Sequence, residues 1–119
     1  AFWLVKFLED VGYQGPRHFD AHAYRTEDYE GVKDFARGCM RTYLILKEKA
    51  ACWNADKEIQ AILKELSATR KGVPAVGRFS KQGADALLKH QFDKDAIMKK
   101  RLPYERLDQL TIDILAGVR

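Results

Sequence analysis

The feature that most constrains this sequence is a single strand candidate that lies between two helical patterns. Residues 16–20 (PRHFD) begin at the turn dipeptide Gly15-Pro16 and are the only segment whose pattern favours a strand. A strand in a parallel sheet needs hydrogen-bonding neighbours on both sides, and the sequence predicts no second strand to provide them. We therefore expect a piece of a longer chain, or a chain that partner chains complete, and the start at Ala1 inside a helical pattern favours the piece.

Amphipathic helices are predicted on both sides of this strand candidate. Residues 2–11 place apolar side chains at three-four spacing, and Gly12 is a typical stop signal. The longest helix is expected over residues 26–52, with Thr26 as its N-cap and two acidic residues in its first turn. Its apolar stripe indicates a packed face rather than a cofactor site, and consists of Tyr29, Val32, Ala36, Cys39, Met40, Tyr43, Leu46 and Ala50.

The second half of the sequence predicts shorter helices joined by long loops. Asn54 is expected to cap the next helix, and residues 69–80 form a basic loop with glycine and proline. Ser80 or Gly83 opens a short helix, and Pro103 suits the first position of the last helix. Because aromatic anchors are few here, we expect an arm that lies on another surface rather than a self-contained core.

Composition excludes several classes of protein. Apolar residues make up 46% of the chain and charged residues 32%, so neither a disordered chain nor a membrane protein is expected. The net charge of +4 comes from 21 basic and 17 acidic residues that are interspersed, which gives little support for nucleic-acid binding. The densest basic cluster, residues 99–101, has no aromatic stacking platform beside it. We expect no nucleic-acid partner and no membrane partner.

The two cysteines indicate a reducing compartment. Cys39 and Cys52 fall on the same predicted helix, about 20 Å apart along its axis at 1.5 Å per residue. A disulfide requires Cα atoms within about 7 Å, so these two cannot pair within that helix. Free thiols are typical of the cytoplasm, which is where we expect this protein.

Three polar side chains, His18, Asp20 and His22, alternate along the extended segment, so that a strand would place them on one face. In one interpretation, Asp20 points into an active site at the C-terminal face of a parallel sheet. In a second, all three side chains bind one metal ion. In a third, they end the strand and form only local hydrogen bonds. The three-ligand site is the least favoured, because side chains two apart lie about 6.6 Å apart along a strand.

Other catalytic patterns are weaker. Ser67 and Ser80 have no histidine near them in the sequence, so no nucleophile–base pair is indicated. The segment GVPAVG lacks the lysine-serine pair and the preceding strand of a phosphate-binding loop. Only the extended segment therefore suggests chemistry.

Five blocks of the sequence together resemble one enzyme family. They are AFWLVKFLEDVGYQGPRHFD, RTEDYEGV, GCMRTYLILKEKA, ALLKHQFD and YERLDQLTIDILAGVR. These blocks look like the C-terminal part of xylose isomerase, of the short type found in actinobacteria, and the similarity runs from Phe2 to Arg119. The most specific part is the GYxGPRHFD block followed by RTEDY.

The resemblance implies a (β/α)8 TIM barrel with a helical C-terminal arm that embraces a neighbouring subunit of a homotetramer. On that basis residues 1–53 are the last βα portion of the barrel, with a helix, the strand at 16–20 and a long helix. Residues 54–119 are then the oligomerisation arm. This chain is expected to be mainly α as it stands.

The resemblance also implies a chemistry. The family interconverts D-xylose and D-xylulose, and D-glucose and D-fructose, by a hydride shift that needs two divalent ions, Mg²⁺, Mn²⁺ or Co²⁺, in each complete active site. The aspartate of HFD is a ligand of the first metal, and it carries over to Asp20. His18 and His22 are expected beside the metal or the sugar, where they orient their neighbours.

Two departures from the family pattern limit what this chain can do. A lysine usually stands two residues after the metal aspartate, and His22 occupies that place here. The family's catalytic residues and its other metal carboxylates come from earlier barrel strands, so none is expected in these 119 residues. The sequence thus predicts part of an isomerase that takes a sugar substrate. The alternative is a truncated, catalytically incomplete oligomerisation module derived from it.

Overall fold

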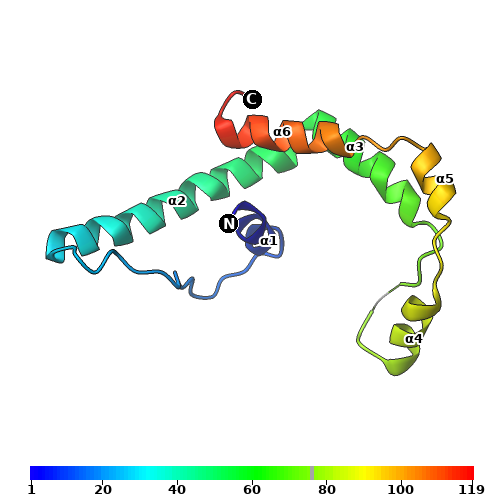
Figure 1. Cartoon of the computed structure of the whole chain (residues 1–119), viewed down its shortest axis with the longest axis horizontal. Helices are drawn as coiled ribbons and strands as arrows, with labels where there is room; N and C mark the ends of the chain where they lie inside the picture. Colours follow the sequence, from blue (N-terminus) through cyan, green and yellow to red (C-terminus); the bar gives the residue numbers. More distant parts are fainter. Residues whose placement is uncertain (76) are drawn as a thin grey trace. The chain divides into compact units, whose positions relative to one another are not determined.

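Helices make up most of the computed structural model, which describes residues 1–75 and 77–119 (Figure 1). The α-helices are α1 (Phe2–Asp10), α2 (Tyr29–Ala55), α3 (Lys57–Ser67), α4 (Lys81–Lys89), α5 (Lys94–Lys99) and α6 (Tyr104–Ala116), and a short 3-10 helix spans Ala68–Arg70. The predicted mainly α class is confirmed. Residue 76, which falls in the loop predicted over 69–80, lies outside the described residues.

The strand predicted at residues 16–20 is not formed. Residues 16–24 have no regular secondary structure, and they run back along α2 toward its N-terminal end (Figure 1). The physical reason is that a strand exists only through its ladder of hydrogen bonds. No other part of the described chain is a strand that could pair with this segment.

Glycine ends α1 as predicted. Gly12 has a φ of +65°, a left-handed conformation that glycine adopts without the strain that a Cβ atom would bring. The amide of Tyr13 donates to the carbonyl of Leu8 at 2.9 Å, and the amide of Gly12 donates to the carbonyl of Glu9 at 3.0 Å. This pair of bonds is the Schellman motif, which satisfies carbonyls at a helix end and turns the chain back toward α2.

The start of α2 corrects one prediction. Its N-cap is Asp28, whose carboxylate accepts the amide of Gly31 at 2.9 Å. Thr26 was expected in this role, but it lies in a turn. A hydrogen bond of 3.0 Å from the amide of Glu27 to the carbonyl of Tyr24 closes this turn. Both residue types are good caps, and the local turn decides which of them precedes the helix.

The junction between α2 and α3 corrects a second prediction. Asn54 was expected to cap the next helix, yet it lies within the last turn of α2. Its side-chain amide donates to the carboxylate of Asp10 at 2.7 Å, a contact across 44 residues of chain. By contrast, Ser80 caps α4 as predicted, because its hydroxyl accepts the amide of Gly83 at 3.0 Å.

The chain divides into two compact units, of which the first is Ala1–Asp56 together with Thr111–Arg119. In this unit α1 packs on α2 (Figure 1). The indole nitrogen of buried Trp53 donates to the hydroxyl of Thr111 at 3.0 Å. The other side chains buried in this unit are Phe2, Val5, Ala50 and Ile114.

The second unit is Lys57–Leu110. Among its described residues, Ile59, Ile62 and Leu110 are buried, and the guanidinium of Arg106 pairs with Glu58 at 2.7 Å. The border predicted between residues 53 and 54 on family grounds stays a prediction. Among the described residues, no helix combines the length and the apolar character that crossing a bilayer requires.

Candidate functional site

The three predicted site residues lie on the irregular segment beside α2. His18, Asp20 and His22 are all exposed. A ring nitrogen of His22 lies 2.8 Å from the carbonyl oxygen of Ala23, which is a local contact. In the described part of the chain, no three histidine, cysteine, aspartate or glutamate side chains come together as a metal site. The structure therefore does not support the interpretation in which all three bind one ion.

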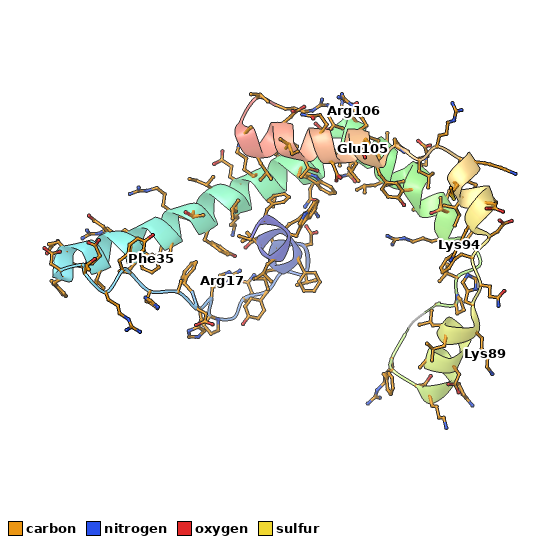
Figure 2. The ribbon with its side chains drawn as sticks, in the orientation of Figure 1. Arg17, Phe35, Lys89, Lys94, Glu105 and Arg106 are labelled. Atoms are coloured by element: carbon orange, nitrogen blue, oxygen red, sulfur yellow. The ribbon has the colours of Figure 1, made fainter. Side chains whose placement is uncertain are left out.

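An apolar groove borders this segment. It has a volume of about 680 Å³ and lies between α1, residues 13–19 and α2. Phe35 of α2 lines it from one side and His18 from the other, and Figure 2 labels Phe35 on α2 near the segment. Other side chains that line the groove include Leu4, Val5, Leu8, Phe19, Cys39, Tyr43 and Leu46. The groove therefore offers mainly apolar contact area.

A polar cluster that the sequence did not reveal lies behind this segment. We call it the Glu9 cluster, and it consists of Glu9, Arg17, Tyr43 and Lys47. One carboxylate oxygen of Glu9 accepts the Tyr43 hydroxyl at 2.5 Å and the Arg17 Nη2 at 3.3 Å. The other oxygen of Glu9 pairs with the Lys47 Nζ at 2.9 Å. The cluster thus joins α1, the irregular segment and α2.

The contacts of Glu9 favour its ionised form. The hydrogen bond from Tyr43, then those from Lys47 and Arg17, lower the pKa of Glu9 from 4.5 to about 2, against a smaller opposing effect of burial. The side chain of Glu9 is 21% exposed, so water still screens part of these interactions. Glu9 therefore carries a negative charge at neutral pH.

Arg17 has the largest number of partners in the cluster. Its Nη1 donates to the carbonyl of Gly15 at 2.9 Å, its Nη2 donates to the carbonyl of Tyr13 at 2.8 Å, and its Nε donates to the hydroxyl of Tyr43. The guanidinium carbon lies 5.2 Å from the centre of the Tyr43 ring, within the range of cation–π attraction. Figure 2 labels Arg17 between α1, α2 and the segment that carries it.

Phe19 adds a second attachment to the same tyrosine. Its ring meets that of Tyr43 edge to face, with 6.5 Å between centroids and an interplanar angle of 83°. Such a geometry is favoured by the quadrupoles of the two rings. Residues 17 and 19 are therefore both held against α2.

Helical periodicity predicts that two of the four residues of the Glu9 cluster lie together. Tyr43 and Lys47 are four residues apart on α2, so they share a face. Their partners Glu9 and Arg17 stand on either side of the turn at Gly12, and only the folded turn brings them together. Pattern alone could not predict that meeting.

This chain is similar to part of several known enzymes, although no protein-family model matches it. A curated xylose isomerase of Thermus caldophilus is 49% identical over 120 residues, and one of Thermus thermophilus is 50% identical over 120 residues. Each of these alignments covers 100% of this chain and 31% of the relative. A xylose isomerase of Streptomyces lividans is 43% identical over 124 residues, with 100% of this chain and 30% of the relative covered. The chain thus spans about 30% of the length of these relatives.

Proposed function

We infer that this chain, which belongs to the xylose isomerase family and is homologous along its whole length to part of those enzymes, supplies one metal-binding carboxylate to an aldose–ketose isomerase. That carboxylate is Asp20. The observation that carries the proposal is identity of 43–50% over the whole chain with proteins named xylose isomerase. The exposure of Asp20 also supports it, because an exposed carboxylate is accessible to groups from outside the described residues.

The Asp20 carboxylate suits one ligand position of a magnesium or manganese site, but the described residues do not supply a complete set of ligands. Hard divalent ions prefer oxygen ligands and take six or more of them. The imidazoles of His18 and His22 are poor substitutes, and the described residues contain no three-ligand group. We propose that the remaining ligands come from polypeptide outside residues 1–119.

We propose a division of labour that follows from this fit. The bound ions would supply charge that polarises the sugar oxygens during the isomerisation of D-xylose. Asp20 contributes negative charge and orientation at the edge of that site, and α1 and α2 hold the segment on which Asp20 lies. His22 stands where the family usually has lysine, so an imidazole ring takes the place of an ammonium group there.

Assembly is the second part of the proposal. Phe79 is 87% exposed and Leu88 is 85% exposed, and surfaces of this kind favour association at roughly 25 cal/mol per Å² of apolar area buried. We propose that such residues meet other copies of the chain, in the manner of the homotetramer that the family resemblance implies. This exposure also favours the alternative function, an oligomerisation module without activity of its own.

A graft tests the enzymatic proposal. Residues 1–119 would replace the matching segment of the Thermus thermophilus relative, and the chimaera would be assayed with D-xylose and Mg²⁺. We expect turnover that Asp20→Asn lowers by at least about tenfold, the scale on which changes around a metal site act. Asp85→Asn, at an exposed aspartate of α4, is the matched control and leaves turnover unchanged. An Asp20→Asn chimaera with unaltered turnover would remove Asp20 from the site.

The alternative function is tested on the 119-residue chain itself. Light scattering after size exclusion measures its mass, and the same fraction is assayed with D-xylose and Mg²⁺. An oligomer without turnover, together with a chimaera that never gains turnover, would establish the module. A monomer of 13.7 kDa with clear turnover would contradict both proposals.

A further inference from the structure

The segment that carries Asp20 needs something to hold it. Residues 16–24 form no helix or strand, so no ladder of backbone hydrogen bonds orders them. A carboxylate on a loosely held segment samples many positions, and each of them must be given up when a ligand binds. Pre-organisation of the segment would therefore favour binding.

Arg17 contacts both helices that lie beside the segment, α1 and α2. It donates to two carbonyls of its own turn, those of Tyr13 and Gly15, at 2.8 and 2.9 Å. It also contacts Glu9 of α1 at 3.3 Å and the hydroxyl of Tyr43 of α2. A guanidinium suits this task because its donors form a rigid planar fork, which a lysine ammonium does not provide.

The attachment of the segment to α2 also restricts where Asp20 can lie. Arg17 and Phe19 both contact Tyr43, and they are two residues apart. Asp20 follows Phe19 directly, so the attachment of residues 17 and 19 to α2 restricts the positions that the Asp20 backbone can take. The side chain of Asp20 is exposed in the structure.

We propose that Arg17, held by Tyr43 and Glu9, is a positioning residue that fixes the segment so that the Asp20 carboxylate is presented to a divalent metal ion. This inference rests on the proposed function, in which Asp20 is a metal ligand. It adds a role for three residues that do not touch the metal themselves. Tyr43 is the most informative of them, because the loss of its hydroxyl removes the acceptor of the Arg17 Nε and a donor to Glu9 while the ring is kept.

The first experiment asks whether Tyr43 orders the segment. The 119-residue chain is digested briefly with trypsin, which can cut after Arg17 and after Arg25, an exposed arginine of the same irregular region. We expect Tyr43→Phe to raise the rate of cleavage at Arg17 by about tenfold, because proteolysis follows local opening, and to leave cleavage at Arg25 unchanged. Tyr29→Phe removes the hydroxyl of an exposed tyrosine at the start of α2 and is the matched control.

The second experiment asks whether that order matters for the metal. Calorimetry measures the Mn²⁺ affinity of the chimaera with each variant, and thermal unfolding is followed in parallel. We expect Tyr43→Phe and Arg17→Lys each to weaken Mn²⁺ binding by about tenfold, with Tyr29→Phe at the unaltered value. A residue with a purely structural role would lower the melting temperature and leave the Mn²⁺ affinity of the folded chimaera alone.

The outcomes separate this inference from the proposed function. If Asp20→Asn weakens Mn²⁺ binding while Tyr43→Phe and Arg17→Lys do not, the positioning role is wrong and the proposed function stands. If Asp20→Asn has no effect either, the proposed function fails first. Equal trypsin cleavage at Arg17 in the unaltered chain and in Tyr43→Phe would also overturn the inference, and this result does not depend on the chimaera.

Discussion

Two regions of the molecule have equally good helix caps but differ in how many side chains their helices bury. Residues 1–56 contain α1 and α2, which bury four side chains between them, namely Phe2, Val5, Ala50 and Trp53. Residues 81–99 contain α4 and α5, which bury none. Yet the caps are equally good, since Asp28, Ser80 and Asp93 each accept a backbone amide near 3 Å.

The difference separates what starts a helix from what gives it a core. A cap is formed by residues three apart in the chain, so sequence neighbours suffice. A core needs partners from distant positions, as when Trp53 donates to Thr111 across 58 residues. In the region of α4 and α5 apolar side chains are present but none is buried, and Leu88 is 85% exposed, which is why we assign such residues to contacts with other copies.

The largest expected contrast comes from truncating one apolar side chain in each region. Trp53 is 5% exposed, and Trp53→Ala should lower the free energy of unfolding by about 3–5 kcal/mol. Leu88 is 85% exposed, and Leu88→Ala should change it by no more than about 0.5 kcal/mol. Urea unfolding followed by circular dichroism measures both. Equal effects would mean that the two regions do not differ in the way described.

A medium effect is expected from acid. The pKa of Glu9 is lowered to about 2 in the folded chain from 4.5 when unfolded, so its ionised form stabilises the fold. This contribution is complete above pH 4.5 and is lost as the pH falls toward 2. Glu9→Gln should therefore lower the melting temperature at pH 7 but not at pH 2.

The control for this prediction is Glu48→Gln, at an exposed glutamate of α2 that takes no part in the Glu9 cluster. Glu48→Gln should leave the difference in melting temperature between pH 7 and pH 2 the same as in the unaltered chain. Parallel pH profiles for Glu9→Gln and the unaltered chain would show that the contacts of Glu9 do not stabilise the fold.

Element boundaries could be predicted where the cause is local. Gly12 and Ser80 act through bonds to residues within five positions, and both predictions are confirmed. Thr26 and Asn54 were wrong as caps, because a turn and a distant aspartate took precedence. The strand at residues 16–20 failed because it needs partners that these residues do not include.

The candidate site was less accessible to sequence analysis than the helices. Asp20 was identified through family resemblance, and its metal role stays a prediction. Of the Glu9 cluster, only the shared face of Tyr43 and Lys47 could be predicted. Arg17 and Glu9 meet through the folded turn, and no periodic pattern encodes such a meeting.

The smallest effect is expected at the cap of α4. Ser80→Ala removes the acceptor of the Gly83 amide and should cost about 1 kcal/mol of helix stability. Because α4 buries no side chain, we expect nuclear magnetic resonance to report fraying confined to residues 81–89, with the urea midpoint unchanged. A shift of that midpoint would show that α4 unfolds together with the buried parts of the chain.

The proposed function depends most on Asp20 as one ligand of a metal site that other polypeptide completes. Calorimetric titration of Mn²⁺ into the 119-residue chain and into the chimaera tests this directly. We predict no saturable binding to the chain alone, binding to the chimaera, and a loss of at least about tenfold in affinity on Asp20→Asn. Tight binding to the chain alone, or equal Mn²⁺ affinity of the chimaera with and without Asp20→Asn, would contradict this role of Asp20.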